Sequence, residues 1–562
     1  MHTFNQPYKW ATALLVALLC LAPVTSYGQG SIRIPEEALI DETAVREVLA
    51  NGEQLERQGR WGEALSFYED ALRLQGFDVS VQRKANLARL HYDVGRRYSD
   101  QSFVRSVDAM SRDEALRLYD EVLRKVQASY VDSPRWSEVA REGMKQLDVA
   151  LKEEVFANKN LKNVQRDQIE RVRRMLNENV NWQEVSSPQQ AVEMANYAAE
   201  LMWQNLGVTP TATVLEFACG TAASLDPYTS FLTQDQLAEV YSQIEGNFVG
   251  LGVELKTEAN ALLIVNSIDG SPAHQAGIRS GDRIVAVDGQ RCEVISPDKA
   301  ADLLKGPIGS TVRVSIVAAD QSTRDIVVRR DRVEVPSVDN IHILDPESKV
   351  GYLKITNFQK NTPADLSQAL WKLHREGMRA LVIDLRGNPG GLLTASVDMV
   401  DLFVEEGTIV STRGRNARED FDYTAHMPGT WRVPLVVLID SNSASASEIF
   451  AGAIRDHRRG TVVGQRSYGK GSVQGIFPLA TAGTGLRLTT AKFYSPSGRA
   501  ISRNGVLPDV KVRVAAKPAF GQNGLADNAQ PQGDPVMDAG LTAAKELIGI
   551  TGLSTRLQQD QR

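Results

Sequence analysis

The sequence predicts a multidomain protein of mixed α and β structure: a helical N-terminal region, a β-rich middle segment and an α/β layered core. Residues 36–205 are rich in Ala, Leu, Glu, Arg and Gln and nearly free of proline, which favours helices. Residues 244–335 alternate strand-like Val and Ile runs with glycine-containing turns, and residues 338–515 alternate strand and helix patterns. At about 150 residues per domain, 562 residues accommodate three or four domains.

The N-terminus has the pattern of a secretory signal peptide. Lys9 precedes an apolar run at 11–22, followed by small and polar residues. The run is too short to span a bilayer and has the length of a signal-peptide apolar stretch, with Ser26 and Gly28 as cleavage points. We therefore expect residues 1–28 to be a signal peptide, with a retained membrane anchor as the alternative.

Composition excludes several classes of function. Apolar content of 42% and charged content of 23% are typical of a globular protein, and a net charge of −6 gives no argument for nucleic-acid binding. Cys219 and Cys292 fall in different predicted domains, so no disulfide framework is expected. The seven histidines are scattered without a pair at ligand spacing. We expect neither a metal nor a cofactor.

The helical region contains a pattern that resembles the second half of a tetratricopeptide repeat. The pattern consists of Gly59, Trp61, Ala64, Tyr68, Ala71 and Leu72. Gly52 stands where the first helix of such a repeat has a small residue, and the pattern returns at Ala115, 51 residues after Ala64 rather than 34. An irregular repeat and a plain helical bundle both remain open. A concave helical surface would suit a partner or adaptor, and residues 206–243 are expected to lead helically into the next domain.

The predicted core alternates apolar strands with amphipathic helices. A polar stretch from 516 predicts a linker that leads to a final helix over 536–550, so that 516–562 form a separate tail. The expected strands are 350–355, 380–385 and 433–439, and the expected helices are 364–376, 392–405 and 445–458.

One run of the core carries the chemistry. Ser445 follows a strand and begins a predicted helix, whose free backbone N–H groups can stabilise an oxyanion, and Glu448 lies one turn later. A serine needs a base to become a nucleophile. His457 would lie about 18 Å along the helix axis. Lys470 is the better base, because it sits in a Gly-Lys-Gly turn where burial would disfavour its charged form.

A second loop completes this candidate site. Asp384 to Leu393 reads Asp-Leu-Arg-Gly-Asn-Pro-Gly-Gly-Leu-Leu, a strand that ends in a glycine-rich turn. The bare N–H groups of such a turn can hold an anion. The loop is therefore a natural second donor to an oxyanion.

Together these motifs resemble the carboxyl-terminal processing proteases, the S41 family of serine peptidases with a Ser/Lys dyad and an embedded PDZ domain. The resemblance covers about residues 210–515, including the family-like segments 225–232 and 492–502. Asn442 replaces the usual glycine before the serine run, and Asn tolerates the left-handed conformation better than most residues. Tyr468 replaces the usual Phe.

The resemblance implies an α/β core of the ClpP/crotonase-like type and a role for each matched residue. It implies Ser445 as nucleophile and Lys470 as general base, Gln474 and Glu448 as supports for the lysine, and the amides of Ala446 and Gly391 as the oxyanion hole.

Residues 244–335 resemble a PDZ domain. Residues 248–253 match the carboxylate-binding loop, with Leu251, Gly252 and Val253 as the expected peptide-binding residues, and 271–289 match the domain core. In such a domain a peptide adds as a strand to the sheet edge while backbone amides hold its terminal carboxylate.

We therefore expect an exported serine endopeptidase, in the periplasm or cell envelope of a bacterium, that cleaves proteins with apolar C-termini near those ends. Membrane association is expected only through the N-terminus. The alternatives are a catalytically silent PDZ and helical-repeat binding scaffold, and a hydrolase of small esters. Ser445 and Lys470 together argue against the first, because a silent core needs neither. The PDZ-like segment argues against the second.

Overall fold

The computed structural model describes most of the chain. Of the predicted signal peptide, the described part includes residues 14–17 alone. Linker residues 516–532 also lie outside the described part. The described residues are 14–17, 42–75, 78–162, 164–179, 182–258, 260–295, 297–318, 320–513 and 533–559.

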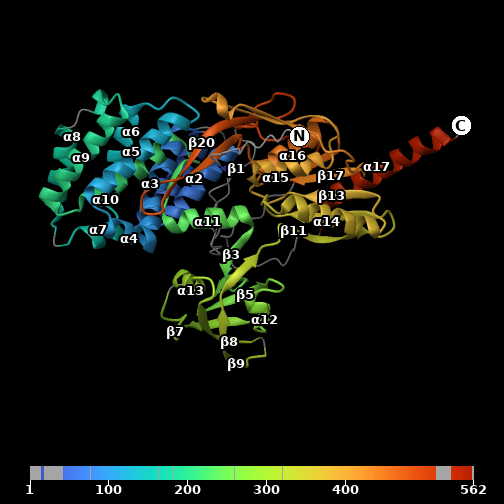
Figure 1. Cartoon of the computed structure of the whole chain (residues 1–562), viewed down its shortest axis with the longest axis horizontal. Helices are drawn as coiled ribbons and strands as arrows, with labels where there is room; N and C mark the ends of the chain where they lie inside the picture. Colours follow the sequence, from blue (N-terminus) through green and yellow to red (C-terminus); the bar gives the residue numbers. More distant parts are fainter. Residues whose placement is uncertain are drawn as a thin grey trace, which may run out of the picture.

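The N-terminal region is helical, as predicted (Figure 1). Gly52 in the first helix faces Tyr68 in the second so closely that a Cβ at Gly52 would lie 2.2 Å from the tyrosine ring. A small residue is therefore required there, while the tetratricopeptide-like organisation stays a prediction. The helices are α1 (Glu42–Arg57), α2 (Trp61–Gln75), α3 (Val79–Ser99), α4 (Gln101–Ala109), α5 (Arg112–Ser129), α6 (Trp136–Ala150), α7 (Glu154–Asn160), α8 (Arg166–Asn179) and α9 (Pro188–Leu206).

A buried helix ties this region to the core. In α10 (Pro210–Leu225) every residue from Thr211 to Ala222 is buried, and the helix packs among α5, α6 and α9. The predicted helical segment is then interrupted by β2 (Ser230–Leu232), which pairs with a core strand, before α11 (Gln234–Glu245).

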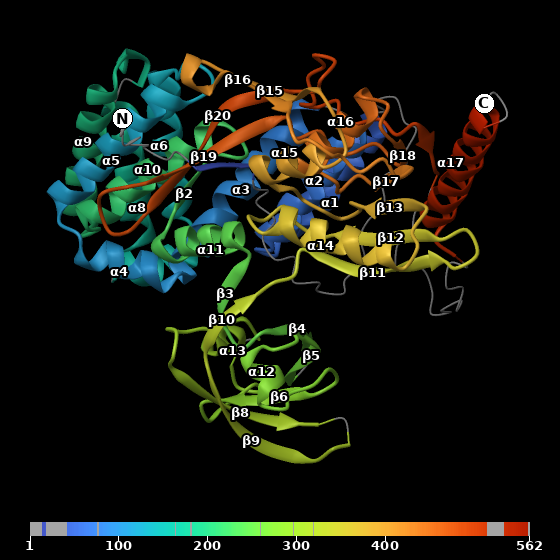
Figure 2. The same cartoon turned by 45° about the vertical axis from the view of Figure 1, so that its right-hand side comes forward.

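A small β lobe projects from the body on two strands (Figure 2). The strands β3 (Asn247–Gly250) and β10 (Asp331–Glu334) enter and leave the lobe and pair only with each other among the described residues. The lobe sheet has the order β4-β5-β6-β8-β9, so that β4 is an edge strand. Its elements are β4 (Val253–Glu258), β5 (Ala261–Ser267), α12 (Pro272–Gln275), β6 (Arg283–Val287), β7 (Gln290–Arg291), α13 (Pro297–Leu304), β8 (Thr311–Val317) and β9 (Thr323–Arg329).

The first sheet of the core is mostly parallel, with helices on both faces, as its near-continuous apolar strands predict. Along β13, Leu381 and Ile383 face the helices α14 to α16, whereas Ala380 and Val382 face α17. The strand order is β11 (Val338–Asp345), β12 (Val350–Ile355), β13 (Ala380–Asp384), β17 (Leu435–Ile439), β18 (Thr461–Gly464) and β21 (Val510–Lys511). The helices are α14 (Thr362–Arg375), α15 (Leu393–Asp401), α16 (Ala446–Asp456) and α17 (Pro535–Gln559).

The second sheet extends from the core toward the helical region, where β20 runs beside it (Figure 1). It includes a short strand from the predicted signal peptide, β1 (Leu14–Ala17), between β14 and β19. The order is β14 (Gly391–Leu392), β1, β19 (Ser472–Pro478), β20 (Gly485–Tyr494), β15 (Gly407–Gly414) and β16 (Phe421–Ala425). The predicted mixed α and β class is confirmed.

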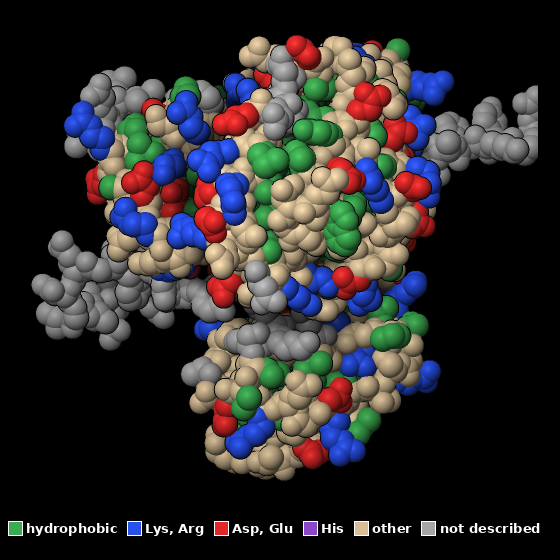
Figure 3. All heavy atoms as spheres, turned by 90° about the vertical axis from the view of Figure 1, so that its left-hand side faces the viewer, with side chains coloured by type: hydrophobic (Ala, Val, Ile, Leu, Met, Phe, Trp, Pro, Cys, Tyr) green, Lys and Arg blue, Asp and Glu red, His purple; other side chains and the backbone are tan. Residues whose placement is uncertain are grey.

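The visible surface carries both signs of charge. On the face drawn in Figure 3, lysine and arginine side chains are interspersed with aspartate and glutamate over the body and the lobe. No single-sign surface on this face suggests a polyanionic or polycationic partner.

Candidate active site

Ser445 lies at the N-terminal end of α16, after the loop that follows β17. It is fully buried, with φ 56° and ψ −114°, a conformation that a non-glycine residue keeps only where its surroundings impose it. The Asp440 carboxylate shapes the loop by accepting the N–H groups of Asn442 and Ser443, both at 3.0 Å. The left-handed region is occupied by Ser445 and not by Asn442.

The glycine-rich loop packs directly on Ser445. A Cβ on Gly390 would lie 2.8 Å from the Ser445 Cβ and 2.9 Å from the Ala446 nitrogen. Gly390 and Gly391 also have φ of 106° and 144°, which disfavour any side chain. The Asn388 side chain accepts the Gly390 N–H at 2.8 Å and stiffens the turn. The structure therefore places Gly390, the chain neighbour of the expected oxyanion donor Gly391, against Ser445 and the other expected donor, Ala446.

Lys470 is fully buried in the turn before β19. The flanking glycines allow this, because Gly469 has φ 92° and a Cβ on Gly471 would lie 2.1 Å from the Ser502 nitrogen. The Lys470 Nζ lies 4.9 Å from the centroid of the Tyr228 ring. Of the two segments that resemble the family, 225–232 thus contacts the lysine through Tyr228, and 492–502 packs against Gly471 through Ser502.

Glu448 joins the two halves of the site. Its Oε2 accepts the backbone N–H of Ser445 at 2.8 Å and of Lys470 at 2.9 Å. Its Oε1 accepts the Gly469 N–H at 2.6 Å and the Ser467 hydroxyl at 2.5 Å. Burial raises the pKa of Glu448, and these four hydrogen bonds act against that rise. One carboxylate oxygen therefore holds the backbones of Ser445 and Lys470 side by side.

Gln474 lies on β19, four residues after the lysine. Its side-chain nitrogen donates to the Ser472 hydroxyl at 2.9 Å and to the Thr489 hydroxyl at 3.3 Å. Its side-chain oxygen is buried and has no hydrogen-bond partner among the described residues. That oxygen is therefore an acceptor available to a proton donor that enters the site.

His457 lies at the other end of α16. The helix has 11 residues, so its ends are about 16 Å apart. The His457 Nε2 lies 2.7 Å from the Thr408 carbonyl oxygen. This placement agrees with the helix-length argument against His457 as a base for Ser445.

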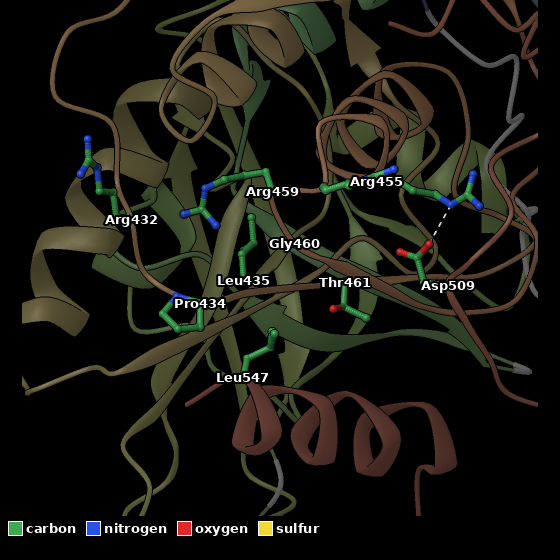
Figure 4. Close-up of a pocket in the computed structure, with 10 residues that line it drawn as sticks. Arg432, Pro434, Leu435, Arg455, Arg459, Gly460, Thr461, Asp509 and Leu547 are labelled. Atoms are coloured by element: carbon green, nitrogen blue, oxygen red, sulfur yellow. Dashed lines mark hydrogen bonds and ion pairs between the residues drawn. The ribbon is translucent and has the colours of Figure 1, made fainter. Parts of the chain in front are cut away.

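A basic pocket of about 420 Å³ opens near the same end of α16 (Figure 4). The Arg455 Nε donates to Asp509 Oδ1 at 2.9 Å across it. Because the pocket lies a helix length from Ser445, its size does not mark the site of the chemistry. Four arginines line it: Arg432, Arg455, Arg458 and Arg459.

The expected carboxylate-binding loop of the β lobe lies between the connecting strand β3 and the edge strand β4. Leu251 is buried, and its carbonyl accepts the Ala273 N–H at 2.8 Å. Gly252 has φ 81°, and a Cβ there would lie 2.2 Å from the Ser271 Cβ. Val253 begins β4, which pairs only with β5 among the described strands. A peptide could therefore add along β4.

Sequence reasoning missed two residues of the site, Tyr228 and Ser467. Tyr228 belongs to a segment already identified as family-like, but nothing local to that segment indicates that its ring covers Lys470. Ser467 is an ordinary serine before the Tyr-Gly-Lys-Gly turn, and only the fold reveals its hydrogen bond to Glu448.

In the part of the chain that the structure describes, no cluster of His, Cys, Asp and Glu residues could hold a metal ion. No helix in it is both long and apolar enough to cross a bilayer.

Comparisons with known proteins agree with this architecture. The model of peptidase family S41 matches residues 349–512, and a PDZ domain model matches residues 263–317. The carboxy-terminal-processing protease of Bartonella bacilliformis is 39% identical over 300 residues, which cover 52% of this chain and 68% of that protein. The carboxyl-terminal-processing protease of Synechocystis is 33% identical over 341 residues, 59% of this chain and 79% of that protein.

Among solved structures, the photosystem II D1 C-terminal processing protease has 27% sequence identity and a TM-score of 0.37, over 71% of this chain and 92% of that one. The fold and the matched domains define a serine protease with a PDZ domain. The chain belongs to peptidase family S41, as a carboxyl-terminal-processing protease.

Proposed function

We propose that this protein is an exported endopeptidase in which Ser445 is the nucleophile and Lys470 the general base. The observation that carries the proposal is the Glu448 carboxylate, which accepts the backbone N–H groups of both residues. Two sequence-distant turns are thereby held together around a buried serine and a buried lysine. Burial disfavours the ammonium form of a lysine, which favours a side chain able to accept a proton.

In this mechanism the Ser445 Oγ attacks the carbonyl carbon of the scissile peptide bond while Lys470 takes the hydroxyl proton. The tetrahedral intermediate collapses, the C–N bond breaks, and Lys470 gives its proton to the leaving amine. A water molecule, deprotonated by the same lysine, then hydrolyses the ester and returns the serine hydroxyl. No group other than protein side chains and water is needed to balance these steps.

The backbone N–H groups of Ala446 and Gly391 are proposed to hold the oxyanion. Ala446 is the first residue of α16, where N–H groups have no partner within the helix. Gly391 lies beside Gly390, which contacts Ser445 too closely for any side chain. Donors fixed in place before the reaction need no reorganisation, which is why such sites accelerate acyl transfer strongly.

Glu448 and Gln474 are proposed to position the lysine. Glu448 acts through the backbone, because its carboxylate accepts hydrogen bonds from three main-chain N–H groups and one hydroxyl. Gln474 offers a buried carbonyl oxygen that has no partner among the described residues. A lysine that has just accepted a proton gains a hydrogen-bond donor that this oxygen can satisfy.

The PDZ domain is proposed to capture the substrate C-terminus. The edge strand β4 offers its free edge to an added peptide strand, and the loop of Leu251, Gly252 and Val253 precedes it, where backbone amides can hold a terminal carboxylate. Substrates with apolar C-termini would then be held while a nearby bond is cut. Export through the N-terminal segment, and a partner or adaptor on the helical region, complete the proposal.

The dyad is tested by digestion of an unfolded protein with the full chain and its Ser445→Ala and Lys470→Ala variants. Both variants are expected to lose about a thousandfold or more in kcat. Ser99→Ala and Lys152→Ala are matched controls, because both residues lie on the surface of the helical region. Equal digestion by all five proteins would refute the dyad.

A further inference from the structure

A single strand separates the two sides of the proposed active site. In the second core sheet, β1 (Leu14–Ala17) lies between β14, which carries Gly391, and β19, which carries Gln474, and is antiparallel to both. Because neighbouring strands lie about 4.8 Å apart, β14 and β19 are roughly 9 to 10 Å from each other. We call the space between them the strand slot. It accommodates one extended chain, with a sheet edge on either side.

The register of β1 places its C-terminal end at the proposed oxyanion hole. Ala17 is opposite Gly391, and Val16 is opposite both Leu392 on one side and Gln474 on the other. The Leu392 N–H donates to the Phe358 carbonyl at 2.7 Å, on the side away from the slot. Because successive N–H groups of an extended chain point to opposite sides, the Gly391 N–H faces the slot.

The walls of the slot favour an apolar occupant. Leu392 on β14 and Val473 and Ile476 on β19 belong to the main hydrophobic core and are at most 7% exposed. Both flanking strands offer backbone groups, so each residue of the occupant forms hydrogen bonds to one side or the other. A chain that lies here must therefore be extended, and proline would remove one of its N–H donors.

From this placement we propose that the strand slot binds the substrate residues that precede the scissile bond. The peptide runs antiparallel to β19, and the residue in the place of Ala17 supplies the carbonyl that Ser445 attacks. This inference rests on the proposed dyad and adds the direction, register and chemical class of the bound segment: extended, apolar and free of proline.

The chemical step is then fixed in position. The Ser445 Oγ bonds to the carbonyl carbon of the residue in the place of Ala17, and the bond from that carbon to the next nitrogen breaks. The nitrogen leaves as an amine with the proton held by Lys470. Water then cleaves the ester, so that the new C-terminus is the residue opposite Gly391.

A peptide with the sequence of residues 12–19, flanked by lysine pairs for solubility, tests the register. With the full-length enzyme we expect one main cut, after the alanine in the place of Ala17, as read by mass spectrometry of the products. Proline in the place of Val16 is expected to lower kcat/KM roughly tenfold, which corresponds to one lost hydrogen bond. Proline in the place of Leu19, beyond the cut, is the matched control.

The outcomes separate this inference from the dyad. Cleavage at another bond, or equal kcat/KM for the two proline peptides, overturns the strand slot even if Ser445→Ala abolishes cleavage. Undiminished cleavage by Ser445→Ala instead overturns the dyad.

The occupant can come from this chain itself or from another polypeptide. In the full-length protein, Val16→Pro removes an N–H of β1 and should weaken its hold on the slot. If the KM for the test peptide then falls roughly tenfold, the segment around β1 of the same chain competes with the peptide for the strand slot. An unchanged KM assigns the slot to other polypeptides alone.

Discussion

The protease core and the PDZ lobe differ in how firmly their functional residues are held. In the core, Ser445, Glu448 and Lys470 are all fully buried, and the Glu448 carboxylate links two separate stretches of chain. The lobe is joined to the body by β3 and β10, and its proposed peptide-binding loop follows β3 directly. The proposed chemistry therefore lies in the part whose groups are buried and hydrogen-bonded, and the proposed recognition lies in the part that two strands join to the body.

This difference predicts that the two parts act on different kinetic constants. Changes in the core that leave the fold intact should lower kcat, because they act on the groups that are proposed to contact the reacting atoms. Changes in the lobe should raise KM for long substrates with a free C-terminus and leave short peptides unaffected.

The largest effect is expected from Lys470→Arg. Arginine places a permanent positive charge at the site and cannot accept a proton, because its guanidinium stays protonated. We expect kcat to fall about a thousandfold with little change in KM. Binding of a C-terminal peptide to the PDZ lobe, measured by fluorescence anisotropy, should be unchanged. A variant that retains most of its kcat would show that Lys470 acts only as a cation.

The next effect is expected from Glu448→Gln. A glutamine presents an N–H₂ group where one carboxylate oxygen accepts two donors, so the backbones of Ser445 and Lys470 lose part of their alignment. We expect kcat to fall about a hundredfold, the size of effect that a misplacement near 1 Å produces. A purely structural role would lower the thermal midpoint instead and leave kcat per folded molecule intact, so both are measured.

In the lobe, Gly252→Ala should raise KM and spare kcat. The new Cβ would lie 2.2 Å from Ser271, which displaces the proposed carboxylate-binding loop. For a long substrate with a free C-terminus we expect KM to rise roughly tenfold, which corresponds to one lost charge-assisted hydrogen bond. Gly289→Ala is the matched control, since Gly289 also has a positive φ but no atom within 4 Å of the added Cβ. An equal rise in KM in both variants would mean that backbone strain, and not displacement of the carboxylate-binding loop, is the cause.

Much of the core could be predicted from the sequence because its signals are local. The strands of the first sheet are short apolar runs. The spacing of Ser445 and Glu448, and the two glycines that flank Lys470, can also be read directly from the sequence. The three-residue spacing placed Glu448 on the same helix face as Ser445. It could not indicate that the Glu448 carboxylate accepts hydrogen bonds from the backbone N–H groups of Ser445 and Lys470.

The remaining features depend on contacts between distant parts of the chain. The Tyr228 ring over Lys470, the Ser467 hydroxyl on Glu448 and the position of β1 beside Gly391 each join segments that no periodicity relates. The tetratricopeptide-like pattern has the opposite limitation. Gly52 against Tyr68 satisfies it locally, but a repeat is defined by how successive helix pairs stack, so the assignment stays a prediction.

The smallest effect is expected at the back of the core, where Asp345 binds α17. Its carboxylate accepts from the Ser348 N–H at 2.9 Å and from Lys545 on α17 at 3.1 Å. The Ser348 hydroxyl and backbone, with Lys545, lower the pKa of Asp345 to about 2. A lowered pKa in the folded state means that the ionised form stabilises the fold above the ordinary value of 3.8, and that this contribution is lost as the pH falls toward about 2.

Asp345→Asn should therefore lower the thermal midpoint at neutral pH by at most about 2 °C, because such pairs contribute little. The difference from the wild type should shrink as the pH is lowered from 3.8 toward about 2, because the carboxylate is protonated first in the unfolded chain and then in the folded one. Asp325→Asn, at a side chain in the lobe that accepts from Ser315, is the control. If α17 is anchored to the core as described, only Asp345→Asn changes the unfolding of the core. A pH-independent difference would mean that the aspartate acts through its shape and not through its charge.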